Sequence, residues 1–308
     1  MFERARLFCF NGMLHFARDG KLAFLPDALF LRAQYWLKLG RVLHLKHPRL
    51  YNEKLQWIKL YDRKPAYSTI ADKLAVRDYV RERLGEGVLI PLIAEYDRVD
   101  QIDWAVLPDR FVIKCTHGSS SNIIVIDKSK LDVEDAKRKL NLWMGRNWFN
   151  LSREWPYKEI PPRIIVEQFI GAENGKAPFD YKIMCFSGKP AYVIVDADRF
   201  TGHTRNFYDT NWIKQDIFNR HPNISYEIER PAQLAEMLSI AQTLSQGFAH
   251  IRVDLYVALG RVYFGEMTFF HGYGMEVYRP ESFERHLGDL ISLPAPADKE
   301  PCAVRRPS

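Results

Sequence analysis

The 308-residue sequence lacks the features that define several large classes of protein. No stretch is long and apolar enough to predict a transmembrane helix. The apolar positions of the first twenty residues are interrupted by Arg4, Arg6 and Arg18, which argues against a signal peptide. The four cysteines lie far apart and form no C-x-x-C pair, so we expect free thiols in a reducing compartment. These absences predict a cytoplasmic protein.

The chain is basic, but its charges are not concentrated in a long run. It has 44 Lys and Arg against 38 Asp and Glu, a formal net charge of +6 and a pI near 9.0. This balance favours anionic partners such as nucleotide phosphates, lipid head groups or acidic polymers. Without a basic run, we do not expect nucleic acid to be the partner. A hydrophobic content of 47% is typical of a globular, core-forming protein.

Hydrophobic periodicity predicts helices first and then a mixture of strands and helices. Helical spacing covers residues 25–39, 52–61, 67–84, 131–144 and 231–245. Short β-rich runs predict strands at 88–94, 111–115, 123–126, 164–170, 181–186, 190–195, 251–257 and 261–268. Residues 199–230 show no period and predict a long functional loop, and the tail beyond Leu293 is expected to be disordered. This order predicts an α+β protein with two antiparallel-sheet lobes and a cleft between them.

The N-terminal region is helical and basic, and its apolar face has two interpretations. Leu29, Ala33 and Trp36 recur at helical spacing with Arg32 and Lys38 on another face. Packing of this face against the core is the interpretation that we prefer. Peripheral association with the inner membrane is the alternative.

The last predicted hairpin carries the clearest group of chemical residues. Arg252 and Asp254 share one face of the first strand, because side chains alternate along a strand. Glu266 and Thr268 share one face of the second strand. A turn at 258–260 would place Asp254 beside Glu266, and two adjacent carboxylates favour a cation such as Mg²⁺. A surface hairpin with solvated charges is the alternative, which the apolar neighbours disfavour.

Three further features have both functional and ordinary interpretations. Lys114 lies in an apolar strand, where a lysine needs an anionic partner, and a Gly/Ser loop at 118–122 follows it. The loop lacks the spacing of a Walker P-loop. Alone, the D-K-L at 72–74 is better explained as a solvated charge pair. The strand end at 166–171 fits an adenine edge and an ordinary strand end equally well.

These features occur in an order that resembles the ATP-grasp enzymes, and longer blocks resemble the TupA-like ATP-grasp family. The blocks are Asn52–Arg63, Phe111–Gly118, Ser152–Tyr157, Asp180–Gly188 and R-V-D-L-Y with Y-F-G-E-M-T-F. The resemblance spans roughly residues 25 to 290 and implies an ATP-grasp fold with flanking helices. It divides the chain into an N-terminal helical region (1–66), two lobes (67–170 and 171–293) and a tail (294–308). Proteins of this family are associated with cell-surface polysaccharide biosynthesis, including the teichuronopeptide type, and some carry a glycosyltransferase label.

The resemblance implies a set of nucleotide-binding residues. These are Lys73, Lys114, Gly118, Ser119, Ser120, Ser121, Glu167, Gln168, Ile170, Asp180 and Lys214. Lys73 and Lys114 would contact ATP phosphates, and the Gly/Ser loop would close over them. Glu167 would accept from the adenine amino group, while the backbone after it reads the ring edge. Asp180 is implied to contact the ribose, and Lys214 a phosphate or substrate.

The resemblance also implies a magnesium site and a catalytic set. The implied Mg²⁺ ligands are Asp254, Glu266 and Thr268. The implied catalytic residues are Arg252, Lys182 and His117. Thr268 replaces the Asn that is usual in ATP-grasp enzymes, and the aromatic F-F-H-G-Y-G segment after it is a second departure. For His117, an acid–base role and a structural role stay open. The stretch at 143–157 is rich in Trp and Tyr, and packing of a lid explains it better than stacking on sugar rings.

The chemistry implied is ATP-dependent ligation of a carboxylate to an amine through an acyl phosphate, with ATP and Mg²⁺ bound. The substrates expected are small molecules, namely an amino acid or amine and a uronic-acid-type glycan. The alternative is a glycosyltransferase that uses a nucleotide sugar, since Asp196-Ala197-Asp198 matches a D-x-D metal motif. A non-catalytic nucleotide-binding protein is a third class, which the full set of charged residues disfavours.

Overall fold

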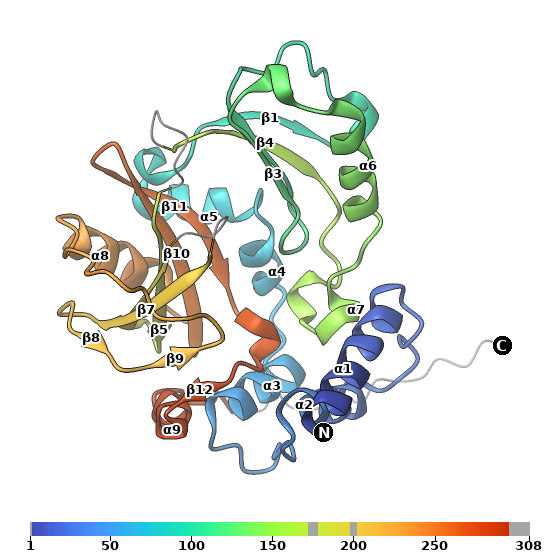
Figure 1. The fold of residues 1–308 in the computed structure, drawn as a ribbon, viewed down its shortest axis with the longest axis vertical. Helices are drawn as coiled ribbons and strands as arrows, with labels where there is room; N and C mark the ends of the chain where they lie inside the picture. The colour runs from blue at the N-terminus through green and yellow to red at the C-terminus, as the bar shows by residue number, and fades with distance from the viewer. Residues whose placement is uncertain (1, 172–177, 198–201, 296–308) are drawn as a thin grey trace.

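The computed structural model describes residues 2–171, 178–197 and 202–295, and it contains two antiparallel sheets (Figure 1). The smaller sheet has the strand order β1-β4-β2-β3, and the larger sheet has the order β11-β10-β5-β6-β7-β8. The predicted α+β class with two antiparallel-sheet lobes is therefore confirmed. Among the described helices, none is long and apolar enough to cross a bilayer.

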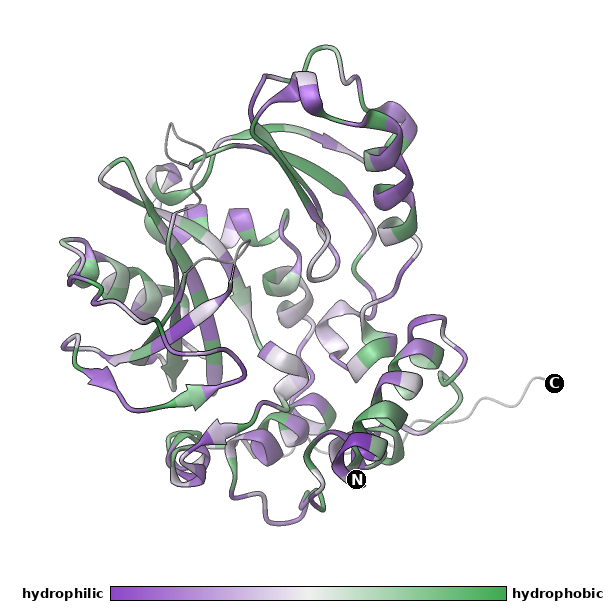
Figure 2. Cartoon of the chain, viewed as in Figure 1, coloured by the Kyte–Doolittle hydropathy of each residue, from purple (hydrophilic) through white to green (hydrophobic). Residues whose placement is uncertain are grey.

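The smaller sheet is built on one apolar cluster. Its strands are β1 (Leu92–Tyr96), β2 (Phe111–Cys115), β3 (Asn122–Val125) and β4 (Ile164–Gln168). Helix α6 (Val133–Met144) buries Ala136 and Leu140, and its first turn is capped by Asp132, which accepts from the Asp135 N–H at 2.9 Å. Figure 2 shows hydrophobic colouring concentrated in the strands and hydrophilic colouring on α6.

The larger sheet carries the second half of the chain. Its strands are β5 (Asp180–Phe186), β6 (Lys189–Ala197), β7 (Thr204–Asp209), β8 (Lys214–Gln215), β10 (His250–Ala258) and β11 (Arg261–Thr268). Helix α8 (Leu234–Leu244) packs on it, and a two-stranded ribbon pairs β9 (Phe218–Asn219) with β12 (Tyr278–Arg279). Ser187 and Gly188 turn β5 into β6 with φ of 49° and 76°, as a two-residue hairpin turn requires.

The remaining helices lie around the larger sheet and between the lobes. They are α1 (Phe2–Arg18), α2 (Asp27–Leu39), α3 (Tyr51–Tyr61), α4 (Ala66–Ala71), α5 (Val76–Leu84), α7 (Phe149–Ser152) and α9 (Glu281–Asp289). Side chains of α2 to α5 join the same apolar cluster as the larger sheet. The domain boundaries at residues 66, 170 and 293 stay a prediction.

Three sequence predictions about secondary structure and packing were wrong. The helix expected at 67–84 is two helices, because the Asp72 carboxylate accepts from the Leu74 N–H at 2.8 Å and turns the chain between them. The expected loop at 199–230 contains the strands β7, β8 and β9; β7 buries four consecutive residues, two polar and two aromatic, so it shows no period-two pattern. The face formed by Leu29, Ala33 and Trp36 is exposed, because α2 buries Phe30, Leu31, Gln34 and Tyr35 instead.

The structure also bears on the cysteines and on the C-terminal tail. Cys9, Cys115 and Cys185 are free, as predicted for the cysteines that the structure describes. Residues 296–308 of the expected tail lie outside the described residues, as does Asp198.

Helix α3 connects parts of the chain that are far apart in sequence. The buried amide of Gln56 donates to the carbonyl oxygens of Gly274 at 2.7 Å and Tyr273 at 3.3 Å. The buried ammonium of Lys59 donates to Tyr273 O at 2.7 Å and to Ser152 O at 3.0 Å. A side chain at Gly274, which has a φ of 61°, would meet Gln56 Nε2 at 2.8 Å. The polar residues of α3 therefore hold the segment that follows β11.

We predict that Gln56→Ala lowers the free energy of unfolding by about 1–3 kcal/mol, because it leaves buried carbonyl groups without their donor. Chemical denaturation followed by tryptophan fluorescence measures this change. The matched control is Gln242→Ala on the exposed side of α8, which should change stability by less than about 0.5 kcal/mol. Equal effects of the two substitutions would contradict the role of α3.

Candidate functional site

The centre of the larger sheet aligns charged residues from three neighbouring strands. Asp254 of β10 pairs with Glu266 of β11 on one side and with Lys182 of β5 on the other. Arg252, two residues earlier on the same face of β10, pairs with Thr268. The pairing of Asp254 with Glu266 that was predicted from strand spacing is thus confirmed.

Asp254 is buried, and cations satisfy its charge. Arg252 donates to both carboxylate oxygens, from Nε at 2.6 Å and from Nη2 at 2.7 Å. The Lys182 ammonium lies 3.1 Å from Oδ2. Burial opposes ionisation of Asp254, but Arg252 and Lys182 outweigh it and hold the pKa of this carboxyl below its usual value. Asp254 is therefore an anion at neutral pH.

Glu266 makes longer contacts and faces solvent. Its carboxylate oxygens lie 3.2 Å from Thr268 Oγ1, 3.5 Å from Arg252 Nη2 and 3.7 Å from Lys73 Nζ. These distances leave oxygen lone pairs of Glu266 available, and a set of two carboxylates and a hydroxyl is chemically suited to Mg²⁺. Within the described ranges no group of three or more His, Cys, Asp or Glu side chains forms a metal site. The fit to a magnesium ion therefore rests on two carboxylates.

Lys73 links the two lobes at this place. It lies in the break between α4 and α5, and its backbone N–H donates to Thr116 O at 3.2 Å. Its ammonium donates to the carbonyl oxygen of Gly118 and lies near Glu266. The Gly/Ser loop that follows β2 is thus brought to the Glu266 carboxylate of β11. Ser119 and Ser120 line the cavity in front of Glu266.

Lys114 has the anionic partner that its apolar strand requires. Its ammonium lies 2.5 Å from Glu167 Oε2, and Arg77 donates to Glu167 Oε1 at 3.0 Å. Arg77 also donates to the carbonyl oxygen of Ile90 at 2.9 Å. The contact of Arg77 with Glu167 was not predicted, since an arginine on a helix has no distinctive sequence pattern. Glu167 is therefore held by two cations, and its implied contact with an adenine amino group stays a prediction.

The residues after Glu167 close the smaller sheet. The backbone N–H of Gln168 donates to Pro91 O at 3.0 Å, so this group is occupied within the protein. Ile170 is half-buried beyond the end of β4. Their implied reading of the adenine ring stays a prediction.

A second group of charged side chains lies on β5, β6 and β7, on the Lys182 side of Asp254. Lys182 donates to Asp180, and Arg205 donates to both oxygens of Asp196, at 2.6 Å and 3.0 Å. Burial opposes ionisation of Asp196, but Arg205 and Lys182 lower the pKa of this carboxyl far below its usual value. The first carboxylate of the D-x-D sequence is thus engaged by a buried guanidinium.

The structure does not bring two predicted residues to the carboxylate pair. The His117 ring is buried, its Nε2 lies 3.2 Å from the accepting carbonyl oxygen of Trp143, and burial lowers the pKa of this imidazole. Lys214 lies on β8, separated from β10 by three strands, and lines a different cavity. β7, which the sequence did not predict, lies between β6 and β8 and keeps Lys214 away from β10.

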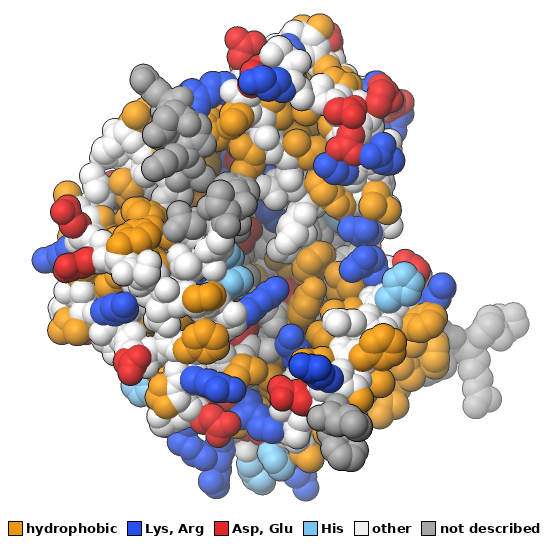
Figure 3. Space-filling model, viewed as in Figure 1, with side chains coloured by type: hydrophobic (Ala, Val, Ile, Leu, Met, Phe, Trp, Pro, Cys, Tyr) orange, Lys and Arg blue, Asp and Glu red, His pale blue; other side chains and the backbone are white. Residues whose placement is uncertain are grey.

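A cavity of about 210 Å³ opens between the Gly/Ser loop and the end of β11. Figure 3 shows the molecule hollowed at the centre of the viewed face, where charged side chains gather between the lobes. Besides Arg252, Glu266 and Thr268, the lining contains Trp148, Glu154, Tyr157, Arg220, His271 and Tyr273. Glu154 lies in the block Ser152–Tyr157, and His271 lies in the F-F-H-G-Y-G segment, but the sequence indicated no role for either residue. Arg220 had no detectable signal in the sequence.

Two of these lining groups are buried and have shifted pKa values. Burial raises the pKa of the Glu154 carboxyl, although Lys59 opposes the shift. Burial lowers the pKa of His271 to about 4, so its imidazole is neutral at neutral pH. The lining of the cavity therefore contains a neutral imidazole.

Comparison with known proteins identifies the fold class and then the family. The two antiparallel sheets are those of an ATP-grasp fold, which the family match identifies. The family model described as TupA-like ATPgrasp matches residues 53–292. The chain belongs to the TupA-like ATP-grasp family. No match was found among curated proteins.

Solved structures with similar arrangements are distant in sequence. One is D-alanine–D-alanine ligase from Bacillus anthracis complexed with ATP (15% identity, 70% of this chain, 57% of that chain, TM-score 0.37). Another is D-alanine–D-alanine ligase from Helicobacter pylori (13% identity, 79% and 69%, TM-score 0.41). A third is a D-cycloserine synthetase (14% identity, 73% and 70%, TM-score 0.41). The chain thus spans little more than half the length of the first of these proteins.

We predict that Asp254→Asn and Glu266→Gln separate stability from metal binding. Asp254→Asn leaves buried cations without a partner and should cost roughly 3–5 kcal/mol of stability. Glu266→Gln removes only long, partly exposed contacts and should cost less than about 1 kcal/mol, yet it should weaken Mg-ATP binding about tenfold or more. Thermal unfolding and calorimetric titration measure the two effects. Glu236→Gln on the exposed surface of α8 is the control. Unchanged Mg-ATP binding by the Glu266 variant would remove this residue from the metal site.

Proposed function

We propose that the protein is an ATP-dependent carboxylate–amine ligase of surface polysaccharide biosynthesis. It joins an amino acid or similar amine to a uronic-acid-type glycan through an acyl phosphate. The observation that carries the proposal is the position of Arg252, Asp254 and Glu266. Arg252 and Glu266 line a cavity to which Lys73 also brings the Gly/Ser loop, and Asp254 is buried beside both of them.

The nucleotide occupies the space between the lobes in this proposal. Lys73 and the Gly/Ser loop contact phosphate oxygens, and Lys114 lies further along the smaller sheet, near the adenine. Asp254, Glu266 and Thr268 hold Mg²⁺, which supplies charge neutralisation for phosphoryl transfer. Arg252, already buried beside Asp254, binds the phosphate that is transferred, and a buried guanidinium stabilises such charge strongly.

The chemistry proceeds between substrates, and the chain positions them. An oxygen of the acceptor carboxylate forms a bond to the γ-phosphorus of ATP while the bond to the β,γ-bridging oxygen breaks, and ADP leaves. The amine nitrogen then bonds to the acyl carbon, the phosphate leaves with the C–O bond electrons, and the amine loses a proton. His271 lines the cavity as a neutral imidazole, but its lowered pKa makes it a weak base, so we assign the amine proton to solvent.

The cavity lining suits an acidic sugar. Trp148, Tyr157 and Tyr273 offer aromatic surfaces on which sugar rings pack, and Arg220 offers a guanidinium for a carboxylate. The tryptophan and tyrosine stretch that sequence analysis assigned to lid packing thus contributes to the cavity. A glycosyltransferase is the alternative, and its D-x-D carboxylate Asp196 is not among the residues that line this cavity.

We predict that incubation with Mg-ATP, hydroxylamine and a glucuronate-containing oligosaccharide yields a hydroxamate and an equal amount of ADP. Hydroxylamine traps an acyl phosphate in place of the amine. Coupled ADP assay and mass spectrometry measure both products. Formation of AMP, or turnover of a UDP-sugar without ATP, would contradict the proposal.

We predict that Arg220→Ala raises the KM for the acidic acceptor about tenfold or more, since it removes one charge-assisted contact, while the KM for ATP stays within about twofold. Steady-state kinetics with each substrate varied in turn measure the two values. The exposed Arg230, changed to Ala, is the matched control. Equal changes in the KM for ATP and for the acceptor would place Arg220 outside the acceptor site.

A further inference from the structure

The first fifty residues expose aromatic side chains to an extent that the rest of the chain does not. Among the residues that the structure describes, every aromatic side chain more than half exposed lies here: Phe8 (79%), Phe16 (52%), Phe24 (78%) and Trp36 (53%). The exposed aliphatic side chains Leu29 and Val42 lie in the same segment. Large apolar side chains gathered on a surface mark an interaction site.

Helix geometry places Phe8 and Phe16 on the outer face of α1 and Leu29 and Trp36 on the outer face of α2. In α2, Leu29, Ala33 and Trp36 recur every third or fourth residue and share one face, opposite the buried Leu31 and Tyr35. In α1, Phe8 and Phe16 lie on the side opposite the buried Phe10 and Ala17. The two helices pack against each other, with Arg6 donating to Trp36 O at 3.0 Å. Both helices thus turn an apolar face outward.

The net positive charge of the protein lies in this segment. Residues 1–50 contain nine Lys and Arg against three Asp and Glu, which equals the formal charge of +6 of the whole chain. The remainder of the chain has equal numbers of each sign. This segment also precedes the part of the chain that matches the family model, which begins at residue 53. Neither the apolar face nor the charge is therefore required by the matched ATP-grasp region.

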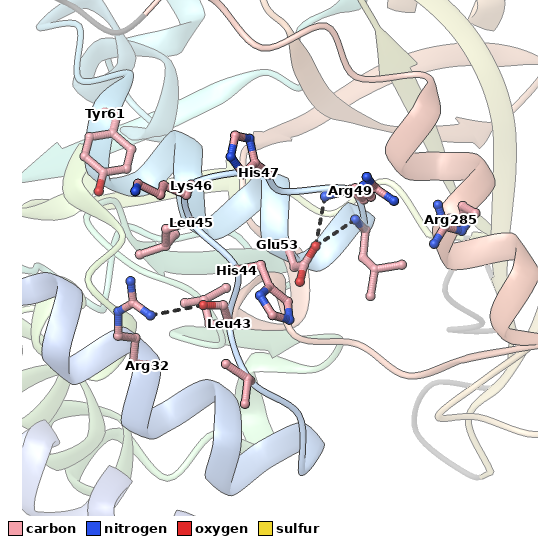
Figure 4. Close-up of a pocket in the computed structure, with 12 residues that line it drawn as sticks. Arg32, Leu43, His44, Leu45, Lys46, His47, Arg49, Glu53, Tyr61 and Arg285 are labelled. Carbon is pink, nitrogen blue, oxygen red and sulfur yellow. Dashed lines mark hydrogen bonds between the residues drawn. The ribbon is translucent and has the colours of Figure 1, made fainter.

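A basic pocket of about 620 Å³ adjoins the apolar face (Figure 4). Its cationic and imidazole side chains come from α2, the following loop and α9, and they are Arg32, His44, Lys46, His47, Arg49 and Arg285. Glu53, the acidic residue among the described lining, accepts from the backbone N–H groups of Arg49 at 2.9 Å and Leu50 at 3.0 Å. Arg32 and the exposed Val42 belong to this lining, so pocket and apolar face are continuous.

We propose that α1, α2 and the basic pocket form a docking surface for an anionic lipid bilayer. Exposed phenylalanine, leucine and tryptophan side chains enter the boundary between head groups and acyl chains, and the basic side chains meet the lipid phosphates. A second copy of the chain is a poorer occupant, since two surfaces that each carry the whole positive charge of a molecule repel each other. The docking surface lies outside the proposed active-site cavity and does not rest on the proposed function.

The test is sedimentation of the full chain with vesicles. We expect binding to vesicles that contain about one-third phosphatidylglycerol, binding weaker by about tenfold or more to pure phosphatidylcholine vesicles, and loss of binding at high salt. The apolar variant is Phe8→Ser with Phe24→Ser and Trp36→Ser. The charge variant is Lys46→Glu with Arg49→Glu. Each should bind anionic vesicles about tenfold or more weakly, with its melting temperature unchanged because the residues are exposed.

Matched controls alter the same number of exposed apolar or basic side chains elsewhere. Val106→Ser with Ile126→Ser and Leu142→Ser is the apolar control, and Lys130→Glu with Arg138→Glu is the charge control. Both should bind vesicles as the unaltered chain does. Equal losses in variants and controls, or equal binding to neutral and anionic vesicles, would overturn the proposal.

Two other occupants give distinct results. If the apolar face joins two copies of the chain, sedimentation velocity will show a dimer that the apolar variant loses, and vesicles will not bind. If the pocket takes only a soluble anion, calorimetry will show binding of inorganic phosphate without binding of vesicles. Either result would overturn docking on a bilayer.

Discussion

The ion pair between Arg252 and Asp254 is the constraint on which the organisation of the site depends. A carboxylate buried in a sheet is stable only with cations at hydrogen-bonding distance, and here the cations come from β10 itself and from β5. A shift of one residue in the pairing of these strands would turn Lys182 to the other face. The requirement to neutralise Asp254 therefore fixes the register between β5 and β10, and a bulge in the pairing of β10 with β11 places Glu266 beside Asp254.

Helix α3 supports the opposite wall of the cavity by the same principle. Lys59 is fully buried, and burial lowers its pKa to about 8, although Glu154 opposes the shift. Its ammonium holds the carbonyl oxygens of Ser152 and Tyr273, which belong to two segments far apart in sequence. Tyr273 has a φ of 62°, a backbone conformation that external hydrogen bonds stabilise. The polar residues of the block Asn52–Arg63 thus shape a cavity to which the helix contributes no lining residue.

The sequence predicts the parts of this arrangement that depend on local pattern. The strands of the closing hairpin follow from period-two alternation. The pairing of Asp254 with Glu266 also needs the bulge between Asp254 and Leu255, where the partner strand carries Gly265 as an extra residue. Contacts between distant segments leave no such pattern, so Arg77 beside Glu167 and Arg220 in the cavity were missed. The apolar face of α2 was assigned to the core because periodicity shows that a helix has two faces without showing which one is buried.

The central prediction is that a metal ion binds between the carboxylates of Asp254 and Glu266. A crystal structure with a non-hydrolysable ATP analogue and Mn²⁺, with anomalous scattering recorded at the manganese edge, measures that position directly. An anomalous peak bonded to both carboxylates, with the nucleotide phosphates extending towards Lys73 and the Gly/Ser loop, is the predicted result. Nucleotide and manganese bound elsewhere, with Asp254 and Glu266 unchanged, would contradict the account.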